Sequence, residues 1–147
     1  LGQVLQKNGS EVLLWHHNDD FVANINSNHK HPFLPGIELS NKIHFTSSLD
    51  EIASYGDMMV LALPSQVVRE VLLQLPKGWN KPIISVSKGI ENDTGLRMSE
   101  VVSKVLNISL DNIIVLSGPS HAEEVSMEIP TAVVVASSNV FDLGRSI

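Results

Sequence analysis

The sequence predicts an α/β protein built on a doubly wound, mostly parallel sheet. Short apolar runs rich in β-branched residues alternate along the chain with stretches in which apolar residues recur at helical spacing. One run, residues 58–63, is almost uninterrupted in its apolar character, as is typical of a strand covered on both faces. Strands that alternate with helices of this length favour a twisted sheet with helices on both sides.

The chain opens with the end of a helix. Residues 1–9 have the pattern of its last turns, and Asn8-Gly9 is a C-terminal stop signal. Nothing precedes this helix to begin it, and there is no initiator methionine, so we expect the chain to begin inside the first helix of a βαβ unit. The first strand and the turn after it would then be missing. A strand is predicted at 11–15 and a short helix at 19–26.

The middle of the chain continues the alternation. A brief strand is expected at 43–45, and Ser48 with Glu51 has the spacing of a capping box that begins a helix. After the strand at 58–63, Pro64-Ser65 ends the extended run, and Ser65 is explained as a helix cap. An apolar stripe at helical spacing follows, made of Val67, Val68, Val71, Leu72 and Leu75.

The last third repeats the pattern. Ser120 and Glu123 give a second capping-box match. Residues 137–147 begin another polar-to-helical passage and stop without a cap, so this end also looks cut. Three strands are predicted at 83–86, 113–116 and 131–136, and a helix carries the stripe Met98, Val101, Val102, Val105 and Leu106.

Composition excludes several classes of protein. A formal charge of −6 with no basic cluster argues against nucleic acid as a partner. No apolar run approaches the roughly 20 residues of a membrane helix, and no signal peptide is present, so neither membrane insertion nor secretion is expected. The chain has no cysteine, which rules out disulfides and thiol nucleophiles and agrees with a cytoplasmic location.

Two loops are the strongest candidates for a functional site. Residues 86–91 (VSKGIE) and 117–123 (SGPSHAE) each follow a strand-like run and lead into a helical pattern. Both should lie at the carboxyl ends of parallel strands, where the ligand crevice of an open α/β protein forms. Lys88 can stabilise charge on a reacting oxygen, and Gly118 lets backbone approach a ligand. The plainer alternatives are a solvent-facing lysine and a serine, Ser120, that only caps a helix.

Histidines supply two further candidates. His17 follows the strand at 11–15, where a dinucleotide fold places the group that contacts the adenosine ribose. A basic residue there tolerates a 2′-phosphate that a carboxylate would repel, which favours NADP over NAD, although a surface histidine explains the position equally simply. His29 and His31 flank a lysine, but no carboxylate or cysteine stands at a supporting spacing, so no metal site is expected.

The order and spacing of eight segments resemble the cofactor domain of bacterial NAD(P)-dependent glycerol-3-phosphate dehydrogenases. Each segment alone is weak evidence, but together they extend over almost the whole chain. They are residues 8–12 (NGSEV), 33–37 (FLPGI), 63–66 (LPSQ), 87–91 (SKGIE), 94–95 (TG), 98–101 (MSEV), 117–120 (SGPS) and 130–132 (PTA).

The resemblance implies a Rossmann-like fold and hydride transfer between a nicotinamide, NADP or NAD, and C2 of sn-glycerol 3-phosphate. The product is dihydroxyacetone phosphate, and in bacteria the reaction feeds glycerophospholipid synthesis. By resemblance Lys88 is catalytic and contacts both substrate and cofactor. Gly118 and Ser120 contact the substrate, and His17 and Ala122 contact the cofactor. A homodimer is compatible with the resemblance.

Two parts that such an enzyme is expected to have are not found among residues 1–147. The Gly-rich turn that holds the pyrophosphate should lie just before residue 1, and the helical C-terminal domain, which carries the proton-exchanging lysine, should follow. Residues 1–147 are therefore expected to form a partial NAD(P)-binding domain that is inactive alone. Two alternatives stay open: a non-catalytic dinucleotide-binding fragment, and a related dehydrogenase of another small hydroxy acid or sugar phosphate.

Overall fold

The computed structural model describes residues 1–34 and 36–139, which form two compact units. The first unit contains Leu1–Gly56 with Ser120–Thr131, and the second contains Asp57–Pro119 with the described residues from Ala132 onward. Pro35 of the FLPGI segment and most of the predicted C-terminal passage lie outside the described residues.

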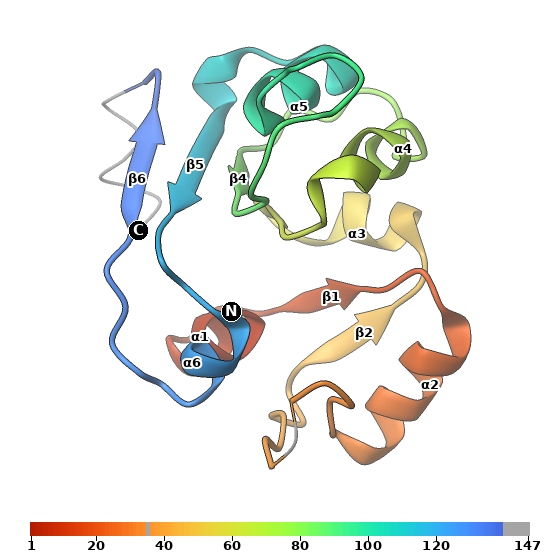
Figure 1. Ribbon diagram of the computed structural model, residues 1–147. Coiled ribbons are helices and arrows are strands. Elements are labelled where there is room, and N and C mark those ends of the chain that lie inside the picture. The colour runs from red at the N-terminus through yellow and green to blue at the C-terminus, as the bar shows by residue number, and fades with distance from the viewer. Residues whose placement is uncertain (35, 140–147) are drawn as a thin grey trace. The chain divides into compact units, whose positions relative to one another are not determined.

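The first unit pairs a two-stranded parallel sheet with helices (Figure 1). The predicted strands and helices are confirmed, with the first helix ending at Asn8 and Gly9 in a positive-φ conformation of 94°. Helix α2 packs beside β2. The elements are α1 (Gly2–Lys7), β1 (Leu13–Trp15), α2 (Asp19–Asn28), β2 (His44–Thr46), α3 (Leu49–Tyr55) and α6 (Ala122–Ser126).

Helix caps in this unit partly follow the predictions. The Ser48 side chain accepts a hydrogen bond from the backbone N–H of Glu51, so the first capping serine is confirmed. The second is wrong: α6 begins at Ala122, and its N-cap is His121, whose side chain makes no capping hydrogen bond. Since Ser120 lies one position before the N-cap, the serine-to-glutamate spacing alone placed the start of the helix too early.

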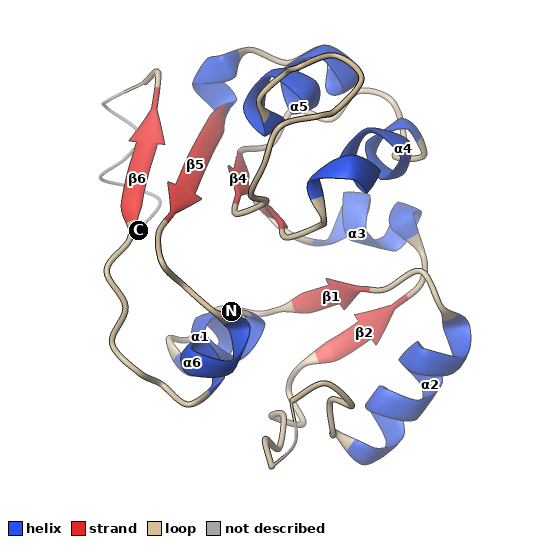
Figure 2. Ribbon diagram, viewed as in Figure 1, coloured by secondary structure: helices blue, strands red, loops and turns tan. Residues whose placement is uncertain are grey.

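The second unit carries a four-stranded sheet in the order β3-β4-β5-β6. Strands β3, β4 and β5 are mutually parallel, and β6 runs antiparallel to β5 (Figure 2). The predicted mixed α/β class with mostly parallel strands is confirmed. The elements are β3 (Met59–Leu61), a 3₁₀ turn η1 (Ser65–Val67), α4 (Val68–Leu73), β4 (Ile83–Ser85), α5 (Met98–Leu106), a 3₁₀ turn η2 (Leu110–Asn112), β5 (Ile113–Ser117) and β6 (Val134–Ser137).

The core of the second unit comes from the predicted apolar stripes. Val68 and Leu72 of α4, Val101 and Val102 of α5 and Ile83 of β4 are at most 2% exposed. Burying such a side chain stabilises the fold by about 1.5–3 kcal/mol. Because β4 belongs to this core, the loop that follows β4 starts from a fixed position. Among the described residues, no helix has the length and apolarity needed to cross a bilayer.

Candidate functional site

Three parallel strands of the second unit end at one edge of their sheet, and each is followed by a segment that the sequence marked as a candidate. Ser65 lies after β3, Lys88 after β4 and Gly118 after β5. In open α/β sheets, ligands bind outside the carboxyl ends of the strands. This edge is therefore the candidate site of the second unit.

Lys88 and Gly118 are brought together across 30 positions of sequence. The Nζ of Lys88 donates a hydrogen bond to the carbonyl oxygen of Gly118 at 2.8 Å, and the lysine side chain is exposed. The bond connects the end of β4 to the end of β5 and places a positive charge at this edge. An exposed ammonium can exchange such a partner for an anionic or polar ligand.

Neighbouring atoms leave little room for a side chain at the glycine of either loop, Gly89 or Gly118. Gly89 has a φ of +120°, and a Cβ there would lie 2.7 Å from the Oγ of Ser65. A Cβ on Gly118 would lie 2.5 Å from the carbonyl oxygen of Ala132, which is a backbone atom that cannot easily move. Ser65 is not the helix cap that the sequence indicated, because η1 has Pro64 as its N-cap without a side-chain bond. Its hydroxyl instead lies close to Gly89 in the loop between β4 and α5, which is called the Lys88 loop.

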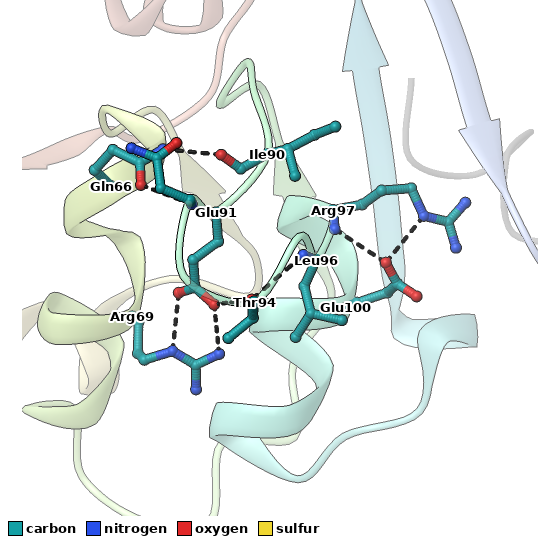
Figure 3. Close-up of polar contacts among 9 residues, drawn as sticks. Gln66, Arg69, Ile90, Glu91, Thr94, Leu96, Arg97 and Glu100 are labelled. Atoms are coloured by element: carbon teal, nitrogen blue, oxygen red, sulfur yellow. Dashed lines mark hydrogen bonds and ion pairs between the residues drawn. The ribbon is translucent and has the colours of Figure 1, made fainter.

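A polar cluster holds the loop that follows β4, and this cluster was not predicted from the sequence (Figure 3). The side chain of Glu91 is 9% exposed and accepts two hydrogen bonds from Arg69 of α4, from Nε at 2.9 Å and from Nη2 at 2.8 Å. The hydroxyl of Thr94 donates a third at 2.5 Å. The hydrogen bonds from Arg69, then from Thr94, lower the pKa of Glu91 to about 2. The carboxylate is therefore charged throughout the neutral range.

Gln66 adds a second contact between η1 and the same loop. Its Nε2 donates to the carbonyl oxygen of Ile90 at 2.8 Å, and its Oε1 accepts from the backbone N–H of Asn92 at 3.0 Å. The amide thus binds the backbone on both sides of Glu91 (Figure 3). Gln66, Glu91 and Thr94 each lie in one of the eight segments listed above, but nothing in the sequence indicated that they contact one another or Arg69.

His17 lies in the first unit, exposed and two positions after the end of β1. Its ring stacks on His16 with centroids 4.5 Å apart, and His16 stacks on Phe21 at 4.0 Å. Burial, then the nearby His17, lowers the pKa of His16, so that ring is neutral near pH 7. The stack presents the imidazole of His17 near a strand end, where the ring can bind a phosphate or stack on a base.

Ser120 and Ala122 also belong to the first unit, at the start of α6. Ala122 is the first residue of this five-residue helix and is exposed, and Ser120 is partly exposed. His29 is the left-handed C-cap of α2, with a φ of 54°. Within residues 1–34 and 36–139, no group of three or more histidine or acidic side chains is arranged to hold a metal ion.

Parallel strands whose carboxyl ends carry a lysine and close-packed glycines, and an exposed imidazole at another strand end, are typical of the nucleotide-binding α/β proteins. Comparison with known families makes the class specific. Residues 1–141 match the family model described as the N-terminus of NAD-dependent glycerol-3-phosphate dehydrogenase. The chain belongs to this family.

Related sequences and solved structures support the same family assignment. The chain is 42% identical over 147 residues to the glycerol-3-phosphate dehydrogenase (NAD(P)+) of Thermotoga sp. strain RQ2, matching 99% of this chain and 43% of the relative. It is 41% identical over 144 residues to the protein of the same name from Bacillus subtilis strain 168, matching 95% and 42%. The crystal structure of the Coxiella burnetii glycerol-3-phosphate dehydrogenase superposes with a TM-score of 0.86 at 26% identity, matching 99% of this chain and 45% of that chain. The chain thus spans less than half the length of these relatives.

Proposed function

We propose that a full-length protein carrying this chain interconverts sn-glycerol 3-phosphate and dihydroxyacetone phosphate with NADP or NAD. The observation that carries the proposal is the ammonium of Lys88, held 2.8 Å from the Gly118 carbonyl oxygen at the carboxyl edge of a parallel sheet, in a chain of this family. This chain would supply the cofactor side of the site. The proton-exchanging lysine would come from the helical C-terminal domain.

The residues present fit a dinucleotide. The first position after β1, His16, and the exposed His17 are not acidic, so a 2′-phosphate would meet no carboxylate directly at the strand end. We assign His17 and Ala122 to the cofactor. When bound, the nicotinamide supplies or accepts the hydride.

Lys88 is the group that we assign to the reacting oxygen. In the reduction of dihydroxyacetone phosphate, C2 gains a hydride, the electron pair of the C=O bond moves to oxygen, and that oxygen takes up a proton. The ammonium would donate a hydrogen bond to the oxygen while its negative charge develops. The Gly118 carbonyl orients the ammonium beforehand, and Gly118 and Ser120 would contact the substrate.

The test is turnover of dihydroxyacetone phosphate by the full-length protein with NADPH and with NADH. Lys88→Ala should lower kcat by about 10²–10³-fold, as expected for loss of one preorganised donor to an oxyanion. Lys77→Ala, which removes another exposed lysine of the same unit, is the matched control and should stay within about twofold. Near-normal turnover by Lys88→Ala would overturn the role of Lys88.

The alternative of a non-catalytic dinucleotide-binding protein would be favoured if the full-length protein binds NADPH but turns over no substrate. We further propose that residues 1–147 alone are inactive and that the protein acts in the cytoplasm, as a homodimer, in glycerophospholipid synthesis. Light scattering of the full-length protein tests the homodimer. The charge of −6 supports the absence of a nucleic-acid partner.

A further inference from the structure

We infer that Glu91, Arg69 and Gln66 are positioning residues that fix Lys88 in its reactive geometry, an inference that rests on the proposed function. None of the three needs to touch a ligand. They would act through the backbone of the loop that carries the lysine.

The loop over residues 86–97 connects β4 to α5 and needs external support. Its internal hydrogen bonds lie in its second half, over residues 90–97. The backbone N–H of Glu91 donates to the carbonyl oxygen of Leu96 at 3.0 Å, that of Gly95 to the carbonyl oxygen of Glu91 at 2.8 Å, and that of Leu96 to the Oγ1 of Thr94 at 3.3 Å. A loop with few buried apolar contacts opens easily unless other elements hold it. Lys88 precedes the residues that these bonds join.

The structure anchors the loop immediately before Lys88. The backbone N–H of Val86 donates to the carbonyl oxygen of Leu61 at 2.9 Å, which extends the pairing of β4 with β3. The Oγ of Ser87 then accepts from the backbone N–H of Leu63 at 3.0 Å. The residue that precedes Lys88 is therefore joined to the segment that follows β3.

The loop is anchored again immediately after Lys88, and by the same segment. Gln66 binds Ile90 and Asn92, and the forked contact of Arg69 fixes the Glu91 carboxylate in distance and in plane. Only Lys88 and Gly89 lie between the two anchors. The direction in which the lysine side chain leaves the backbone is thus set by contacts on both sides.

The alternative is that the cluster merely stabilises the fold. A double-mutant cycle separates the two roles, because a positioning residue loses its effect when the group it positions is absent. Glu91→Gln keeps the shape of the side chain and removes its charge. Gln66→Ala removes an exposed side chain and its two backbone contacts, so it tests the same idea with little risk to folding.

The experiment uses the full-length protein with NADPH and dihydroxyacetone phosphate. Glu91→Gln and Gln66→Ala should each lower kcat by about 10-fold or more, since displacement of a reacting group by about 1 Å costs up to about 10²-fold. The KM for NADPH should change little. In the Lys88→Ala background the same substitutions should change kcat by less than about twofold. Hydrogen exchange should rise at the backbone amides of Glu91 and Asn92.

Glu100→Gln is the matched control. It breaks an ion pair with Arg97 at the end of the same loop, where the side chains are 32% and 71% exposed, and its hydrogen bonds join Glu100 to Arg97 (Figure 3). It should lower stability without lowering kcat.

Equal losses of kcat with and without Lys88, or wild-type kcat in both variants, would overturn the inference while leaving the proposed function intact. Absence of turnover in the unmodified protein would instead overturn the proposed function.

Discussion

Replacing Gly89 by alanine should destabilise the protein far more than the same change at Gly95. Both glycines lie in the loop after β4 and have positive φ, +120° at Gly89 and +68° at Gly95. They differ in their surroundings. A Cβ at Gly89 would lie 2.7 Å from the Oγ and 3.1 Å from the Cβ of Ser65, whereas a Cβ at Gly95 would meet nothing within 4 Å.

The magnitude follows from two costs. A non-glycine residue in a rare positive-φ conformation costs about 1–3 kcal/mol, and the φ of Gly95 lies nearer the left-handed region that L residues can occupy. Overpacking at Gly89 adds roughly 1–3 kcal/mol because either Ser65 or the loop must move. We therefore expect about 2–6 kcal/mol for Gly89→Ala and about 1–2 kcal/mol for Gly95→Ala.

Equilibrium urea denaturation of the full-length protein measures the difference. Adding Ser65→Ala to Gly89→Ala removes the hydroxyl oxygen but leaves the Cβ contact, so it should recover part of the overpacking cost and none of the backbone cost. The same serine change beside Gly95→Ala should recover nothing. If Gly89→Ala proves no more harmful than Gly95→Ala, the close approach of η1 to the Lys88 loop is wrong.

Two further predictions concern stability. The pKa of Glu91 is lowered from 4.5 to about 2 in the folded protein, so its ion pair stabilises the fold fully above its unfolded pKa and loses that contribution as pH falls from about 4.5 to 2. The urea midpoint should therefore fall less steeply across this window in Glu91→Gln than in the unmodified protein, and parallel profiles would contradict the assignment. Gly118→Ala places a Cβ 2.5 Å from a backbone oxygen of Ala132, so it should lower the thermal midpoint, whereas Gly78→Ala, with nothing within 4 Å, should cost only its backbone strain.

The sequence was sufficient for the elements but not for their polar contacts. Apolar runs and stripes predicted the strands and helices because burial of apolar surface dominates their formation. Serine caps were predicted from local sequence alone, which succeeded at Ser48 and failed at Ser65 and Ser120. A serine hydroxyl has several local partners, and tertiary packing decides between them. At Ser65 the hydroxyl accepts a hydrogen bond from the Gln66 side chain at 3.1 Å and lies close to Gly89, which is 24 positions away.

Some contacts of the candidate site could be predicted from the sequence and others could not, again because tertiary packing decides them. Lys88 and Gly118 could be expected to meet because parallel strands end at one edge, and the structure places them in contact. The partners of Glu91 could not be expected, because the burial of a single glutamate in a loop leaves no periodic signal. Its partner Arg69 lies between two residues of an apolar stripe, Val68 and Val71, where an arginine can equally well be a solvated residue at the edge of the helix.

The energetics of the Arg69 and Glu91 pair favour a geometric role over a stabilising one. Burying a carboxylate costs desolvation energy that the attraction to a guanidinium repays only in part, and well-packed apolar residues of similar volume often stabilise a fold as well or better. An apolar pair, however, would fix neither the distance nor the plane of the contact. The forked hydrogen bonds fix both, and they act three positions from Lys88. The pair therefore suits a loop in which the direction of one lysine matters more than the stability of the segment.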